Sequence, residues 1–333
     1  MRQIALFSFI LAFIVVVVGA YTRLTDAGLG CPDWPGCYGQ LLVPESELDI
    51  KHASTLYPEQ PVEILKAKTE MFHRYLASTL GLMIVLLFFG ALKSRKNSIK
   101  VLSFMLFILV IFQGLLGMWT VTLRLLPVVV MGHLLGGLTT LSLLWLLYLF
   151  YKHPEAENFK AINTINPKFR QFAIFTLLAV IIQLALGGWT SANYAALACP
   201  DFPSCLGQYW PEQLNFTDAF NLLSGIGAKF PTLAIHNDAR ITIHFVHRLW
   251  AIVVCSMVLV TCFALWQKKL VRFALVLLAL LTIQLGLGIT NVLAQLPLTT
   301  AVLHNAVGAL LLLALITLNF YLFKAHISEK KLL

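Results

Sequence analysis

The chain has 333 residues, of which 59% are hydrophobic and 12% are charged, with a mean hydropathy of +0.82 and a net charge of +9. Soluble domains carry about twice this share of charge and lack repeated apolar runs of bilayer length, so a soluble domain is excluded, as are a disordered chain, a coiled coil and a small disulfide scaffold. The positive charge does not indicate nucleic-acid binding, because the basic residues gather in short loops between apolar stretches. The composition therefore predicts an integral membrane protein.

Eight apolar stretches are long enough to cross about 30 Å of hydrocarbon as helices of about 20 residues. Helices are expected because backbone inside a bilayer must satisfy its hydrogen bonds within each segment. The first stretch also has features of a signal peptide, but the repeat described below requires it as a span. A helix that begins after Pro61 is expected to run straight into the second span. The predicted spans are Ile4–Ala20, Phe72–Leu92, Val101–Val121, Pro127–Tyr151, Phe172–Thr190, Ile241–Trp266, Phe273–Asn291 and Leu298–Phe323.

Assigning the loops alternately to the two sides of the membrane separates the charges. The side that holds both termini carries fifteen basic and three acidic residues, and the other side carries nine basic and twelve acidic residues. Because loops rich in Lys and Arg stay in the cytoplasm, we expect both termini there and two long loops on the outer side. We therefore expect a multi-pass protein of the bacterial cytoplasmic (inner) membrane, with lipid around its spans.

Cysteine pairs lie in the two long outer loops: Cys31 with Cys37, and Cys199 with Cys205. An oxidising compartment allows each pair to form a short disulfide. Two roles stay open for these bonds, a structural staple of the loop or a thiol–disulfide relay. The two remaining cysteines lie inside the sixth predicted span and are interpreted as small core residues.

The sequence repeats itself at an offset of 168 to 174 residues. Segments 31–40 and 199–208 share seven of ten residues, His73-Arg74 matches His247-Arg248, and His133 matches His304. Ordered matches at a nearly constant offset indicate an internal duplication. We expect two four-helix bundles, residues 1–160 and 161–333. Because four spans return the chain to its starting side, a pseudo-twofold axis along the membrane normal should relate them.

Three glutamines stand four residues before a glycine in spans that run from the cytoplasmic to the outer side. They are Gln113, Gln183 and Gln284, which precede Gly117, Gly187 and Gly288. Polar contacts and close helix approach explain the pattern without a functional role.

Histidines are the ionisable residues that enter the spans, whose interiors contain no Asp, Glu, Lys or Arg. Such a histidine is a hydrogen-bonded core residue, a proton relay or a metal ligand. His73 and His133 lie near the start of two spans that run inward from the outer face, and His247 and His304 repeat the arrangement. Paired imidazoles on facing helices among apolar residues indicate two bis-histidine haem sites, one per bundle. Zinc is disfavoured, because no cysteine or carboxylate accompanies both pairs.

Arginines directly follow the first histidine of each pair, at the boundary where haem propionates would emerge. Arg74 and Arg248 could each clamp a propionate through two charge-assisted hydrogen bonds. Alternatively, each is an interfacial anchor that snorkels to water.

The two pairs differ three residues before the first histidine, where Glu70 stands in the first half and His244 in the second. The i, i+3 spacing places each on the same helix face as its histidine. A carboxylate beside a desolvated macrocycle could exchange a proton with a reacting group. The alternative for Glu70 is a solvated charge in the first turn of a helix. His244 could ligate, donate a hydrogen bond or simply pack.

Taken together, these residues resemble the haem A synthase family of cytochrome-oxidase biogenesis, over essentially the whole chain. Members of this family oxidise a ring methyl of haem O to the formyl group of haem A. The matching residues are Thr22-Arg23-Leu24-Thr25 after the first span, the outer cysteines, Glu70-x-x-His73-Arg74, His133, His247-Arg248 and His304.

The resemblance implies that the first half, with Glu70, His73 and His133, receives haem O, and that Glu70 is catalytic. It implies that the second half, with His247 and His304, holds a b-type haem that relays electrons to an unidentified acceptor. Contact with haem O synthase or with oxidase assembly factors is a further implication. Many members of the family lack the first cysteine pair, so its presence here marks a subgroup. The chain carries no nicotinamide or flavin fingerprint.

Two other functions would use similar features. A quinol-linked, two-haem electron-transfer cytochrome needs the four histidines but does not need Glu70. A transporter or haem-handling scaffold is also built from parallel repeats, but the spans lack the midplane charges that a transport site usually needs.

Overall fold

The computed structural model describes residues 1–153, 166–222 and 235–332, and for residues 325–332 it describes the backbone alone. Within these ranges the chain is helical and forms no strand. The expected boundary between residues 160 and 161 lies outside the described residues.

Eight helices are long and apolar enough to cross a membrane, and each predicted span lies within one of them. The all-α membrane fold is therefore confirmed. The helices are α1 (Arg2–Leu24), α3 (Ile64–Leu92), α4 (Asn97–Thr122), α5 (Pro127–Lys152), α6 (Pro167–Ala192), α8 (Asn237–Gln267), α9 (Val271–Leu293) and α10 (Leu298–Leu332).

Two further helices, α2 (Glu47–Leu56) and α7 (Phe216–Ala219), lie in the long loops and were not predicted. Helix α2 begins after Ser46, whose hydroxyl accepts the backbone N–H of Asp49 at 3.1 Å and so caps the first turn. Helix α3 begins at Ile64, which confirms the expectation of a helix after Pro61 that continues into the second span.

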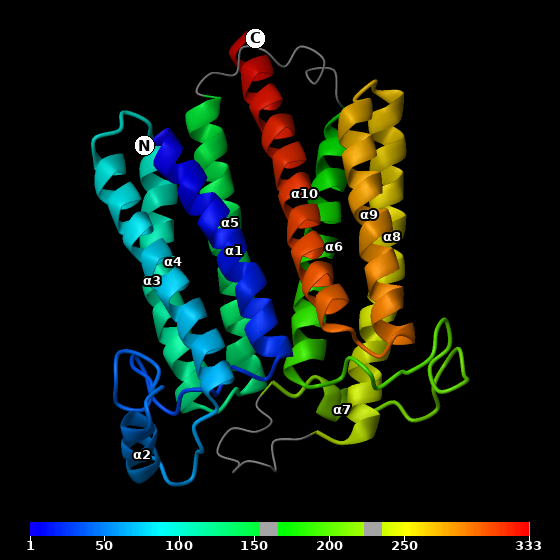
Figure 1. Cartoon of the computed structure of the whole chain (residues 1–333). Coiled ribbons are helices and arrows are strands. Elements are labelled where there is room, and N and C mark those ends of the chain that lie inside the picture. The colour runs from blue at the N-terminus through cyan, green and yellow to red at the C-terminus, as the bar shows by residue number, and fades with distance from the viewer. Residues whose placement is uncertain (154–165, 223–234, 333) are drawn as a thin grey trace.

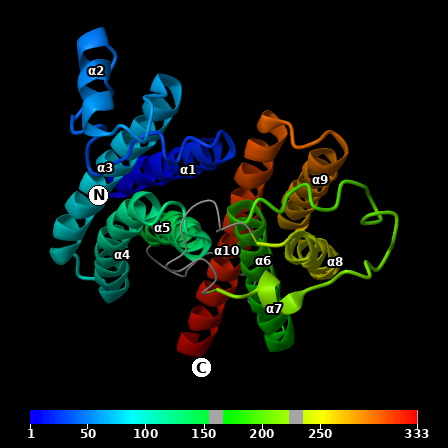
Figure 2. The ribbon, with the colours of Figure 1, turned by 90° about the horizontal axis from the view of Figure 1, so that it is seen from below.

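Each half packs its four long helices in the same cyclic order. Helices α1 and α4 both contact α3 and α5, and helices α6 and α9 both contact α8 and α10. The halves meet where α1 packs on α10 and where α5 packs on α6 and α10 (Figures 1 and 2). Both termini lie at one end of the helices, and α2 and α7 lie at the other end (Figure 1).

The interface between α5 and α10 is close-packed and contains a polar contact. Leu141, Leu144 and Leu147 of α5 are fully buried, and the indole N–H of Trp145 donates to the hydroxyl of Thr317 on α10 at 2.8 Å. Packing and inter-helix hydrogen bonds of this kind hold membrane helices together, because lipid supplies little hydrophobic drive.

At the end that carries α2 and α7, the two halves touch through positions that the sequence repeat makes equivalent. Arg23 donates to the carbonyl of Ser191 at 2.7 Å, and the Tyr194 hydroxyl donates to Asp26 at 3.1 Å; both pairs are 168 residues apart. The Arg23 guanidinium also lies 4.1 Å from the centre of the Tyr194 ring, a cation–π distance.

Candidate functional site

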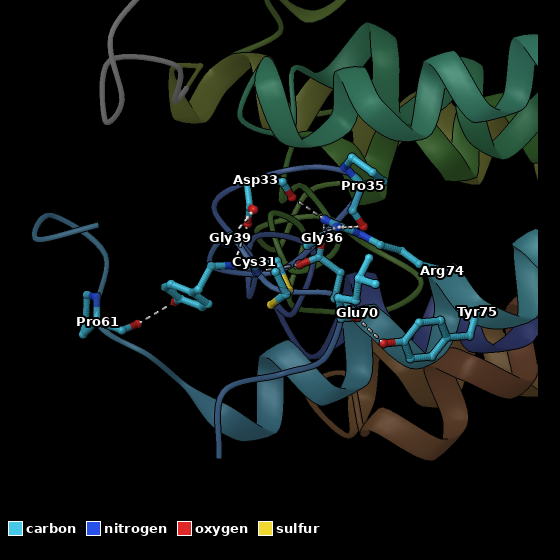
Figure 3. Close-up of a disulfide and its surroundings, with 12 residues drawn as sticks. Cys31, Asp33, Pro35, Gly36, Gly39, Pro61, Glu70, Arg74 and Tyr75 are labelled. Carbon is cyan, nitrogen blue, oxygen red and sulfur yellow. Dashed lines mark hydrogen bonds and ion pairs between the residues drawn. A yellow bond between two sulfur atoms is a disulfide. The ribbon is translucent and has the colours of Figure 1, made fainter. Parts of the chain in front are cut away.

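The first cysteine pair closes a compact loop that lies against Glu70 and Arg74 (Figure 3). Cys31 and Cys37 form a disulfide, and both are fully buried. The Asp33 carboxylate accepts the backbone N–H of Tyr38 at 2.6 Å and of Gly39 at 2.8 Å. The Asp33 carboxylate therefore holds the backbone of the two residues that follow Cys37.

The second cysteine pair closes another loop with the same arrangement. Cys199 and Cys205 form a disulfide, and Asp201 accepts the backbone N–H of Leu206 at 2.6 Å and of Gly207 at 2.9 Å. The hydroxyl of Ser204 also donates to Asp201. These hydrogen bonds, led by that of the hydroxyl, lower the pKa of Asp201 to about 2, so this loop carries a fixed negative charge at neutral pH.

Glu70 is held by the first loop. Its side chain lies in the second turn of α3 and is 5% exposed. One carboxylate oxygen accepts the backbone N–H of Cys31 at 2.9 Å, and the other accepts from Arg74 at 2.5 Å. The alternative of a solvated charge in a first helical turn is wrong, because α3 begins at Ile64 and the loop covers Glu70.

Arg74 is bound to the same loop (Figure 3). Its two terminal nitrogens donate to the carbonyls of Asp33 at 3.1 Å, Pro35 at 3.2 Å and Gly36 at 2.6 Å, in addition to Glu70. Arg74 is therefore tied to protein groups rather than reaching freely to water. A propionate would have to displace some of these bonds, so the propionate role of Arg74 stays a prediction.

His244 takes the place of Glu70 in the second half. The backbone N–H of Cys199 lies 3.2 Å from its Nδ1, and Nε of Arg248 lies 3.1 Å from its Nε2. A neutral imidazole has one acceptor nitrogen, so one of these contacts is a hydrogen bond in a given tautomer. Of the three roles left open, these contacts favour an acceptor packed against the loop.

Arg248 holds the second loop as Arg74 holds the first. It donates to the carbonyls of Cys199 at 2.6 Å and of Asp201 and Ser204 at 2.8 Å each. The propionate role of Arg248 likewise stays a prediction.

The structure brings His73 and His133 together. They lie on α3 and α5, which are diagonal in the first ring of helices, so the two rings meet in the bundle interior. Their ring centres are 6.5 Å apart and the ring planes are inclined by 82°. Two metal–nitrogen bonds of about 2 Å, with about 1 Å from each nitrogen to its ring centre, require about 6 Å. The pair is therefore spaced to hold one metal ion between the rings.

His247 and His304 occupy the corresponding diagonal helices, α8 and α10. Gln183 of α6 places its amide nitrogen 3.2 Å from Nδ1 of His247, and Gln284 of α9 places its own 3.3 Å from Nε2 of His304. These are polar contacts between helices, as expected for the glutamines, and their partners are the candidate ligands. In the first half, the amide nitrogen of Gln113 is buried without a partner among the described residues.

All four histidine rings lie over a glycine of a neighbouring helix. A Cβ placed on these glycines would stand 2.9 to 3.6 Å from Cε1 of the ring, so a side chain at three of the four positions would crowd the histidine. For three of the four, the signal that could have revealed this role is the repeated Gln-x-x-x-Gly spacing, which puts both residues on one helix face; Gly19 has Val15 in place of the glutamine. The pairs are Gly19–His73, Gly117–His133, Gly187–His247 and Gly288–His304.

The donor set fits iron in a porphyrin. All four rings are half-buried, and Nδ1 of His73, His133 and His304 is buried without a partner among the described residues. The exposed part of these rings therefore lies away from Nδ1, which leaves the opposite edge for a metal. Porphyrin iron needs two axial protein ligands, whereas structural zinc takes four. Among the described residues, no group of three or more His, Cys, Asp or Glu is arranged around one point.

These features define a class: helical membrane proteins in which two similar four-helix units each carry two inward histidines beneath a disulfide-closed loop. The chain belongs to the COX15-CtaA family of cytochrome oxidase assembly proteins, which it matches over residues 2–316. It is 44% identical to the haem A synthase of Shewanella oneidensis over 323 residues, 97% of this chain and 96% of that protein. It is 29% identical to the haem A synthase of Caulobacter vibrioides over 345 residues, 95% of this chain and 94% of that protein. The family predicted from the sequence is therefore confirmed.

Proposed function

We propose that the protein is a haem A synthase, which oxidises a ring methyl of haem O to the formyl group of haem A. The observation that carries this proposal is the 44% identity to a haem A synthase over 97% of the chain. The arrangement of the histidines, Glu70 and the disulfide loops supports it.

In the first half, His73 and His133 would hold the iron of haem O and would thereby fix the position of the substrate. Glu70 stands three residues before His73 on α3, and its two oxygens are fixed by Cys31 and Arg74. Oxidation of a methyl group to a formyl group removes protons as well as electrons. A buried carboxylate three residues before an iron ligand is placed to accept such a proton, although its N–H donors must loosen as it does so.

In the second half, His247 and His304 would hold a resident haem b, which supplies one-electron transfer when bound. Gln183 contacts Nδ1 of His247, and a contact to the ring nitrogen that does not bind the metal orients a metal ligand. Gln284 contacts Nε2 of His304, so its amide would have to turn away when that nitrogen binds iron. His244, in place of Glu70, provides no carboxylate. This difference supports substrate oxidation in the first half and electron relay in the second.

The proposed setting is the bacterial inner membrane, with both termini in the cytoplasm and the cysteine loops outside. The distribution of charge supports this orientation, as does the position of both termini at the end of the helices away from those loops (Figure 1). A pseudo-twofold relation between the halves is supported by contacts between positions 168 residues apart. Haem O synthase and oxidase assembly factors are the partners proposed, because the substrate and product must be handed over within the membrane.

The test is expression in a host that makes haem O but no haem A, followed by chromatography of the extracted haems. The native chain should produce haem A. Glu70→Gln should retain both haems and produce none, whereas Glu63→Gln, which changes an exposed acid at the start of α3, should produce haem A normally. Retention of both haems without haem A in the native chain would favour the electron-transfer cytochrome, and absence of any Soret absorption would favour a scaffold or transporter.

A further inference from the structure

A cavity of about 440 Å³ opens where α4 ends in the first half. Its walls are the segment after α1, residues 29–32, the segment after α2, residues 56–60, and Val121, Thr122 and Arg124 at the end of α4. Cys31 is part of the wall, and its backbone N–H holds Glu70. The cavity therefore adjoins the loop that positions the proposed catalytic carboxylate.

Two polar side chains of the cavity lack partners in the described part of the chain. Arg124 is exposed and forms no hydrogen bond or ion pair there. Gln60 lines the same cavity, and its Oε1 is buried without a hydrogen-bond partner. Glu59 is the acid in the lining, and its charge opposes an anion.

Arg124 distinguishes the first half from the second. Helix α4 closes with Arg124 and Leu125 at φ of 48° and 59°, and α9 closes with Gln295 and Leu296 at 58° and 60°. The N–H of Leu125 donates to a carbonyl five residues earlier at 2.8 Å, and that of Leu296 does so at 2.7 Å. The two turns therefore have the same backbone, but only the first presents a cation.

The depth of the histidines links this cation to the haem substrate. His133 stands six residues after Pro127 at the start of α5, which is about 9 Å along the helix axis. A porphyrin held by His133 with its propionate edge toward this end would bring its carboxylates to the level where α4 ends. Arg74 is already bound to Glu70 and loop carbonyls, whereas Arg124 lies just after the end of α4 and its side chain has no partner among the described residues.

We propose that this cavity receives a propionate of haem O and that Arg124 is its cationic partner. The inference rests on the proposed function only in taking haem O as the ligand of the first half. An exposed arginine–carboxylate pair would contribute a modest part of the binding, about three- to tenfold in affinity.

The experiment is a Soret titration of the purified protein, with its second site already filled, using haem O and its dimethyl ester. Arg124→Gln should weaken binding of haem O by about fivefold and leave binding of the ester unchanged. Glu59→Gln should strengthen binding of haem O, because it removes a like charge. Gln295→Arg, the matched change in the second half, should alter neither affinity. Arg124→Gln is compatible with its backbone, since Gln295 adopts a positive φ at the matching turn of the second half.

Equal binding of haem O by the native chain and by Arg124→Gln would overturn the proposal. So would an equal loss for haem O and its ester, because that result would mean a structural role for Arg124. In turnover, Arg124→Gln should raise KM for haem O and leave kcat unchanged. A native chain that does not bind haem O in its first half would refute the proposed function itself, which is a different result from either failure of Arg124.

Discussion

A single added methyl group at the glycines beneath the histidines gives a graded test of the site. The new Cβ would lie 2.9 Å from the ring at Gly19, 3.1 Å at Gly288, 3.2 Å at Gly187 and 3.6 Å at Gly117. Ordinary contact begins at 3.4 Å, so the first three fall short by 0.5, 0.3 and 0.2 Å, and Gly117 has room. The expected order of damage on substitution by Ala is therefore Gly19, then Gly288 and Gly187, with Gly117 unaffected.

The damage should appear in haem binding rather than in folding. The crowded atom is the tip of a side chain, so the imidazole can swing away, but it then no longer points at the iron. Overpacking of this kind costs about 1–3 kcal/mol, which corresponds to about 5- to 150-fold in affinity. Ala instead favours the helix itself by up to about 1 kcal/mol relative to Gly, so the unfolding temperature is the wrong measurement.

The assay is absorption spectroscopy of each purified variant titrated with haem, with electron paramagnetic resonance to verify two axial histidines. Gly117→Ala is the internal control. Native haem affinity in Gly19→Ala, or a loss in Gly117→Ala as large as in Gly19→Ala, would show that the glycines do not set the histidine positions.

Three further predictions concern the loops and the contact between the halves. Cys205 is 1% exposed, and thiol exchange needs access to a sulfur, so the disulfide of the folded protein should resist reductants in a thiol-alkylation assay. Cys205→Ser should lower the free energy of unfolding by about 2 kcal/mol. Rapid reduction of the native protein would instead support a thiol–disulfide relay. The folded-state pKa of Asp201 is lowered to about 2, so the stability from its hydrogen bonds is fully present above the ordinary pKa of 3.8 and is lost as the pH falls through about 2. At neutral pH, Asp201→Asn should therefore speed amide hydrogen exchange at Gly207. Unchanged exchange would contradict this. Arg23→Gln should lower the free energy of unfolding by about 1 kcal/mol, and Tyr194→Phe should lower it by less because it keeps the aromatic ring. Equal stability of the native protein and both variants would count against the contact between the halves.

The spans could be predicted because the length of an apolar stretch is a local property of the sequence, and that length determines whether the stretch can cross the bilayer. Helix α2 could also have been predicted, since Ser46-x-x-Asp49 carries a helix-start signal, although its sequence is too polar to register as a span. The pairing of the histidines within each half was predicted from the direction of their spans and their similar depth, and the repeat showed the same arrangement in both halves.

The surroundings of Glu70 could not be predicted from spacing. A helix after Pro61 that runs into the second span was predicted, and α3 does begin at Ile64, but a helix start alone does not tell whether Glu70 faces water or a loop. Its partner Cys31 is 39 residues away, and that contact depends on how a disulfide loop folds back over the helix. Loop closure of this kind is set by tertiary packing, which leaves no periodic trace in the sequence.

The contacts between repeat-equivalent residues bear on the origin of the molecule. In a symmetric homodimer, a residue near the axis meets its own copy, so it must be self-complementary. Here the position that is Asp26 in one half is Tyr194 in the other, and the position that is Arg23 is Ser191. An acid facing a phenol requires two different residues at the matching positions, whereas a backbone carbonyl is available at any position. The internal duplication places both halves in one polypeptide, where the matching positions can carry different residues and form this unequal pair.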